Sequence, residues 1–246
     1  MLITASTLYR DTGNFFRHQL LNITLLVVFT SCIMMIVSKI LMPSIDEMQV
    51  FGDDLSIGMT RSFFEMIRNM SLEQQKVLLQ ISASGTCSSL IGNTLLLGGM
   101  LSLIRLVSSG KRVSALRAVI ASSPDLINLL SLTFLMMLSI QIGFMVLVVP
   151  GVFLSVTLAL APMIITTDKV GIFTAIYTSS QMGWSHVKVI SPVVMVWILA
   201  KILILVLASA FVILPPDIAI LLLNVLSNFI SSILVIYLSR LYMLLH

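Results

Sequence analysis

Long apolar stretches alternate with short polar or proline-containing segments along the whole chain of 246 residues. A helix rises about 1.5 Å per residue, so roughly 20 apolar residues cross the hydrocarbon core of a bilayer. Two of the stretches end at proline stops, Pro43 and the Pro215-Pro216 pair. The pattern predicts six transmembrane helices, over residues 20–42, 83–107, 126–147, 150–166, 192–213 and 218–238.

The boundary between the third and fourth spans is not visible in hydropathy, because the sequence is apolar without interruption from Leu126 to Ile165. Pro150-Gly151 supplies a break, since proline interrupts helical hydrogen bonding and glycine tolerates a tight turn. We therefore predict a hairpin turn at Pro150-Gly151.

The composition of the chain, together with this pattern, indicates the fold class. Hydrophobic residues make up 58% of the chain and charged residues only 10%, which excludes a water-soluble domain of this length. We predict an all-α fold, a polytopic membrane helix bundle of about six spans, in which residues 1–246 form a single integral membrane domain. Residues 43–82 would form one short loop domain outside the bilayer. The basic residues are scattered between apolar runs and form no patch that could follow a phosphate backbone, so nucleic acid is excluded as a partner.

The basic residues indicate orientation instead, because cytoplasmic loops are enriched in lysine and arginine. The loop over residues 43–82 has six acidic residues against three basic ones, and the other two connections on that side carry no lysine or arginine. We therefore predict cytoplasmic N- and C-termini. With six spans, every basic connection falls on the side of the termini, which carries Arg10, Arg17, Lys111, Arg112, Arg117, Lys169, Lys188 and Arg240.

Three further segments predict helices outside the hydrocarbon. Ser71 and Gln74 have the spacing of a capping box, which satisfies free amides at the start of a helix that leads into the second span. Two other segments place apolar residues on one face beside polar ones, as in helices that lie in the lipid headgroup layer. Their apolar faces are Val113, Leu116 and Ile120 in the first, and Phe173, Ile176, Tyr177 and Trp184 in the second.

Residues that could carry catalysis or hold a metal are scattered. The three histidines, His18, His186 and His246, lie in predicted loops or at a terminus, and neither HExxH nor GxSxG occurs. The chain has no glycine-rich phosphate loop, and its two cysteines have no ligand spacing. Asp53-Asp54 could bind a cation, but a solvated acidic surface is the better interpretation. We predict no catalytic, cofactor or metal site and no enzyme activity.

The ionisable residues within the predicted spans are few and all basic. No Asp or Glu lies within any span, so a transporter coupled to protons or sodium through a carboxylate has no group to use. Lys39 and Arg105 lie about one turn from a span end and can extend to the interface. Lys201 lies nine residues into the fifth span, roughly 13 Å deep, where a lysine costs about 2.5 to 3.5 kcal/mol on insertion.

The sixth span offers a partner for this lysine. Asn224, Asn228 and Ser232 recur every four residues and so share one helical face. A short proline turn makes the fifth and sixth spans antiparallel neighbours, which brings Asn228 near the depth of Lys201. We predict that Lys201 donates to Asn228 or a neighbouring amide, within a polar cluster of Lys201, Asn224, Asn228 and Ser232. The alternative is a lysine that extends to the interface or stays neutral at the lipid-facing surface.

Five short motifs carry a family resemblance: YRDTGNFFR (9–17), VSALRA (113–118), VVPG (148–151), LALAP (158–162) and RLYML (240–244). In order and spacing they resemble the YciC family of bacterial inner-membrane proteins. The resemblance implies an integral, multi-pass protein of the Gram-negative inner membrane, so that the loop over residues 43–82 would be periplasmic. The family is of uncharacterised function and brings no established catalytic, cofactor or substrate residues.

These observations favour a non-enzymatic structural or accessory component of the membrane, whose partners are the lipid bilayer and another membrane protein. The alternative is an uncoupled small-molecule or ion permease that uses the Lys201 and Asn228 face to attract an anionic group. A cavity lined by that face would favour the permease, whereas a tightly filled bundle would favour the accessory component.

Overall fold

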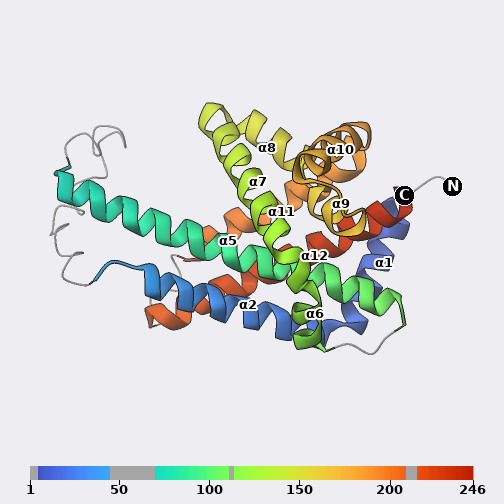
Figure 1. Ribbon diagram of the computed structural model, residues 1–246, viewed down its shortest axis with the longest axis horizontal. Helices are drawn as coiled ribbons and strands as arrows, with labels where there is room; N and C mark the ends of the chain where they lie inside the picture. The colour runs from blue at the N-terminus through green and yellow to red at the C-terminus, as the bar shows by residue number, and fades with distance from the viewer. Residues whose placement is uncertain (1–4, 45–69, 111–113, 209–214, 246) are drawn as a thin grey trace. The chain divides into compact units, whose positions relative to one another are not determined.

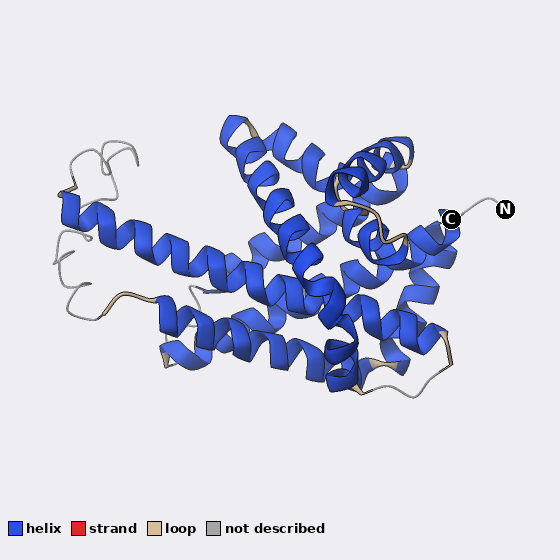
Figure 2. Cartoon of the chain, viewed as in Figure 1, coloured by secondary structure: helices blue, strands red, loops and turns tan. Residues whose placement is uncertain are grey.

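The computed structural model describes residues 5–44, 70–110, 114–208 and 215–245, and Figure 1 shows their path. Figure 2 shows that these residues form helices joined by short loops, with no strand among them. The helices are α1 (Ala5–His18), α2 (Leu20–Leu41), α5 (Leu72–Ser108), α6 (Ala115–Ser122), the short 3₁₀ helix η3 (Ser123–Asp125), α7 (Leu126–Val146), α8 (Val148–Thr157), α9 (Ala161–Thr167), α10 (Ile172–Ser185), α11 (Val187–Ala208) and α12 (Pro216–Leu245).

Six helical stretches in the described part of the chain are long and apolar enough to cross a membrane. The predicted fold class, an all-α polytopic membrane bundle, is therefore confirmed. Some of the residues named in the sequence analysis lie outside the described residues: Asp53-Asp54, Val113 and residues 209–213 of the fifth predicted span. The six stretches are Leu20–Leu41, Leu72–Ser108, Ala115–Val146, Val148–Thr167, Val187–Ala208 and Pro216–Leu245.

The chain divides into two compact units, one formed by residues 33–89 and the other by residues 1–32 and 90–246. The smaller unit holds the end of α2 and the beginning of α5. At the start of α5 the Gln74 amide N–H donates to Ser71 Oγ at 3.2 Å, and the Ser71 N–H donates to Gln74 Oε1 at 3.0 Å. The predicted capping box is confirmed, and the helix that it starts continues unbroken through the second predicted span.

The larger unit is built from helix pairs that bury apolar side chains against each other. α7 packs on α8, α11 on α12, and α1 lies along α12. The α1 contact includes two ring pairs, Tyr9 with Tyr237 at 5.2 Å and Phe16 with Phe229 at 5.6 Å between centroids. These aromatic contacts hold the N-terminal helix against the last span, so α1 belongs to the bundle.

The turn between α7 and α8 does not lie at Pro150-Gly151, where the sequence predicted it. The break falls at Leu147, which is extended, and Pro150-Gly151 lies inside the first turn of α8. Proline is tolerated there because the first amides of a helix have no intrahelical acceptor. Gly151 serves close packing rather than the turn, because a Cβ atom at this position would lie 2.5 Å from the ring of Phe144 in α7.

The fourth predicted span is not one continuous helix. α8 ends at Thr157, and α9 begins at Ala161 after a turn over residues 158–160. Pro162 explains the break, because in a continuous helix its ring would clash with the carbonyl of Leu158. The carbonyl of Thr157 instead accepts a hydrogen bond from the Ser179 hydroxyl of α10 at 2.8 Å. Leu160 is fully buried, as expected for irregular backbone in a membrane protein, which is tolerated only where protein covers it.

Candidate functional site

A cavity of about 450 Å³ lies within the larger unit, and Lys201 of α11 lines it. Its apolar lining includes Leu96 of α5, Met136 and Met137 of α7, and Leu234 of α12. A volume of this size is in the range of small-molecule sites, which are mainly apolar with a few placed polar groups. The polar side chains that line the cavity are Asn93, Thr133, Gln141, Ser155, Trp197, Lys201 and Ser231.

The ammonium group of Lys201 is held by α12. Its Nζ donates to the backbone carbonyl of Ser227 at 3.0 Å and also to the Ser227 hydroxyl. The same Nζ lies 5.4 Å from the ring centroid of Trp197, one turn earlier on α11, which adds a cation–π contact. Within the described residues, none of the hydrogen bonds of Lys201 goes to a carboxylate, so its positive charge is stabilised by dipoles and an aromatic face alone.

A second bond between the same two helices fixes their register. The Trp197 indole donates to Ser231 Oγ at 3.3 Å, and Ser231 Oγ donates to the Ser227 carbonyl at 3.1 Å. Moving one turn back along α11, from Lys201 to Trp197, moves the contact one turn forward along α12. The two helices therefore run antiparallel, as the short proline turn predicted.

The predicted pairing of Lys201 with Asn228 is corrected by this geometry. Asn228 is 1% exposed and faces α2, where its Nδ2 donates to Ser31 Oγ at 2.9 Å and lies 3.5 Å from Thr30 Oγ1. Successive residues of a helix point about 100° apart, so Ser227 and Asn228 reach different neighbours. The lysine contacts the residue immediately before the predicted one.

The other two members of the predicted cluster do not join the lysine either. Ser232 is fully buried and its hydroxyl donates to the Phe229 carbonyl of its own helix at 2.7 Å. Asn224 is half-buried and does not line the cavity. Sequence reasoning missed Ser227 and Ser231, although their spacing of four residues matches that of Trp197 and Lys201 and could have suggested a paired face.

One polar group of the cavity has no hydrogen bond within the described residues. The Thr133 Oγ1 atom of α7 is buried without a partner there. A threonine hydroxyl in a helix usually donates to a carbonyl of the preceding turn, and a buried polar atom without a partner costs about 1 to 3 kcal/mol. The hydroxyl is therefore available to a polar group of a molecule bound in the cavity.

The contacts of Asn228 predict an effect on stability. Asn228→Leu should lower the free energy of unfolding by about 0.6 kcal/mol and at most about 1.7 kcal/mol, because a polar contact between membrane helices is lost. Thermal unfolding in detergent measures the change, with Asn224→Leu as the matched control from the same stripe. An equal loss in both variants would contradict a specific role for the contact with Ser31.

Comparison with known proteins gives the family context of this geometry. The profile of an uncharacterised protein family, UPF0259, matches residues 1–244. The chain is 48% identical to the UPF0259 membrane protein of Pectobacterium carotovorum, with 100% of this chain and 99% of the relative covered. UPF0259 membrane proteins of Serratia proteamaculans and Yersinia pestis are 45% and 44% identical, over 100% of this chain and 99% and 97% of the relatives. No solved structure matches the chain. The resemblance to the YciC family agrees with this family and is confirmed.

Proposed function

We propose that this chain, which belongs to the uncharacterised UPF0259 family of membrane proteins, is a non-enzymatic accessory component that binds an anionic amphiphile. The proposed ligand has a carboxylate or phosphate end and a hydrocarbon body, as fatty acids and phospholipids do. It would occupy the cavity that Lys201 lines.

The observation that carries this proposal is a lysine within an otherwise mainly apolar cavity. An ammonium group at this depth is costly, and an anion beside it offsets the cost because charges attract strongly where water is scarce. The hydroxyl of Thr133, which has no hydrogen-bond partner in the described part of the chain, offers a second polar contact. Met136 and Met137 are flexible, polarisable side chains that adapt to a hydrocarbon chain.

Mass spectrometry of lipids that remain with the purified protein tests this proposal. Wild-type protein in mild detergent should retain an anionic amphiphile at about one per chain. Thr133→Phe should displace it by filling the cavity, whereas Leu138→Phe, at a partly exposed position on the same helix that does not line the cavity, should not. Absence of an anionic amphiphile from the wild type, or equal retention by both variants, would contradict the proposal.

A second candidate function, an uncoupled permease, is favoured by the broken fourth span. Ala159 of the turn and Pro162 of α9 both line the cavity. Many secondary transporters place their substrate site at the interruption of such a discontinuous helix. Because Asn228 faces α2, only Lys201 of the predicted pair would attract the anion in this permease. Anion uptake into proteoliposomes that Thr133→Phe blocks would favour the permease over static binding.

We also propose that the protein lies in the bacterial inner membrane with both termini in the cytoplasm. The distribution of basic residues supports this orientation. The exposed apolar residues Leu116 and Ile120 of α6, and Phe173, Tyr177 and Trp184 of α10, fit helices in the headgroup layer. The bilayer, together with another membrane protein, would then be its partners, and nucleic acid would not.

Reporter fusions test the orientation directly. A fluorescent protein attached after His246 should fluoresce, and alkaline phosphatase inserted within residues 45–69 should be active, because the two positions are predicted on opposite sides of the membrane. Active phosphatase at the C-terminus would overturn the orientation.

A further inference from the structure

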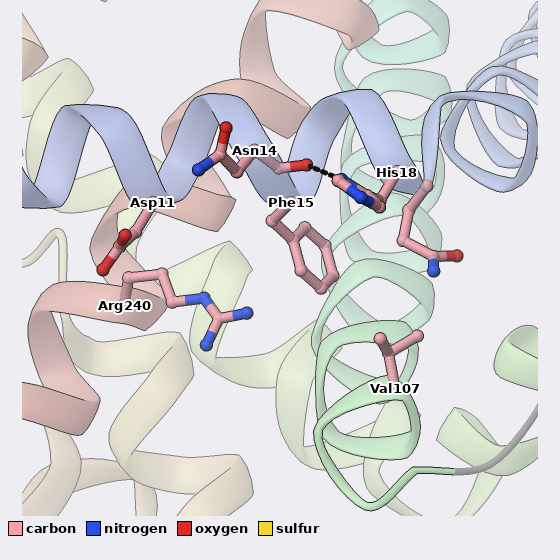
Figure 3. A pocket seen from close by; sticks show the side chains of 7 residues that line it. Asp11, Asn14, Phe15, His18, Val107 and Arg240 are labelled. Carbon is pink, nitrogen blue, oxygen red and sulfur yellow. Dashed lines mark hydrogen bonds between the residues drawn. The ribbon is translucent and has the colours of Figure 1, made fainter.

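A second pocket, of about 300 Å³, lies where α1, the end of α5 and the C-terminal part of α12 meet. Figure 3 shows its residues, with Asp11 and Arg240 on one side and His18 and Val107 on the other. None of these residues lines the Lys201 cavity. The pocket is therefore a separate feature.

Arg240 is the cation of this pocket. Its Cζ lies 5.0 Å from the ring centroid of Phe15, and its Nε is buried without a hydrogen-bond partner within the described residues. Stacking on an aromatic ring fixes the plane of a guanidinium, and a fixed planar fork matches the paired oxygens of a phosphate. The ring contact thus orients the guanidinium of Arg240 in the pocket.

A carboxylate and two side-chain amides share the pocket with this arginine. Asp11, Asn14 and Gln19 all line it. The ring of His18 forms a hydrogen bond with the backbone carbonyl of Asn14, with 2.8 Å between Nδ1 and the carbonyl oxygen. Because Asp11 would repel a plain phosphate, the pocket is complementary to a group that carries one negative and one positive charge.

The position of the pocket indicates where such a group would come from. Val107 lies at the end of the α5 span, next to its last residue, Ser108. Ends of spans lie at the level of lipid headgroups. We propose that this pocket binds the headgroup of a phosphoethanolamine lipid, with the phosphate on Arg240 and the ammonium group near Asp11.

Retention of defined lipids by native mass spectrometry tests this site. Protein carrying Thr133→Phe, which fills the Lys201 cavity, is passed through mixed micelles. It should retain phosphatidylethanolamine about tenfold over phosphatidylglycerol, which has no ammonium group, and over phosphatidylcholine, whose ammonium cannot donate a hydrogen bond. Soluble phosphoethanolamine at the same concentration should not displace the lipid. Equal retention of the three lipids, or displacement by the soluble headgroup, would overturn the proposal.

Three variants separate recognition from folding. Arg240→Gln should lose about tenfold in retention, whereas Arg10→Gln, an exposed arginine of α1 outside the pocket, should lose none. Asp11→Asn alters an exposed position, so it tests the site even if Arg240→Gln does not fold. It should abolish the preference for phosphatidylethanolamine over phosphatidylglycerol. An unchanged preference in Asp11→Asn, or an equal loss in both arginine variants, would refute the site. Because Thr133→Phe fills the Lys201 cavity in each of these proteins, the results are independent of the proposed function.

Discussion

Replacing Lys201 with methionine is expected to lower affinity for the anionic amphiphile by tenfold or more, while the bundle stays folded. A charge-assisted hydrogen bond contributes about 1.5 to 3 kcal/mol, and about 1.4 kcal/mol corresponds to tenfold in affinity. Methionine is unbranched and one heavy atom shorter than lysine, and it removes the cost of a cation at this depth. Lipid retention by mass spectrometry and the midpoint of thermal unfolding in detergent measure the two effects.

Two variants control this experiment. Lys201→Arg keeps a cation in the cavity and should retain the ligand better than Lys201→Met. Leu199→Met alters a residue of the same helix that is 60% exposed, and it should change neither measurement. If Lys201→Met destabilises the protein but leaves lipid retention unchanged, the role of the lysine is structural. It would then stabilise the contact of α11 with Ser227 of α12 and would not bind a ligand in the cavity.

Gly183→Ala is expected to destabilise the protein by about 1 to 3 kcal/mol, although alanine is the better helix former. An added Cβ atom at Gly183 in α10 would lie 2.8 Å from both Cα and the carbonyl oxygen of Thr157. Backbone atoms cannot move aside as a flexible side chain can. The helix would have to shift, and the bond from Ser179 to the Thr157 carbonyl would stretch or break.

Gly13→Ala is the matched control for this change. Gly13 lies within α1, and an added Cβ atom there would meet nothing within 4 Å. Alanine should therefore stabilise the protein, by up to about 1 kcal/mol, through helix propensity alone. The two substitutions should shift the thermal midpoint in opposite directions. A shift of the same sign in both would contradict close packing of α10 against the broken span.

Part of the fold was predictable because it depends on short stretches of chain. The length of an apolar run decides whether a helix can cross the bilayer, whatever its neighbours are. The capping box joining Ser71 and Gln74 is likewise local, since donor and acceptor lie three residues apart. The break before Pro162 was also open to prediction from local geometry, but the hydropathy of the segment concealed it.

The candidate site was predictable only in part. Lys201 could be singled out because a charge within an apolar run is visible in the sequence. Its partner could not be identified by depth alone, because Ser227 and Asn228 lie at nearly the same depth on different faces of α12. The Arg240 pocket could not be predicted from the sequence, since its residues come from three helices far apart in the chain.

The sequence by itself thus determined the membrane setting, the helical class and the number of apolar helices, because each follows from runs of neighbouring residues. Only the tertiary structure decided that Lys201 contacts Ser227 rather than Asn228, that the turn after α7 falls at Leu147, and that α10 covers the break after Thr157. These features depend on how each helix is rotated about its axis and on which helices pack against it. That rotation is set by packing between distant segments and is not encoded in the hydropathy of any one of them.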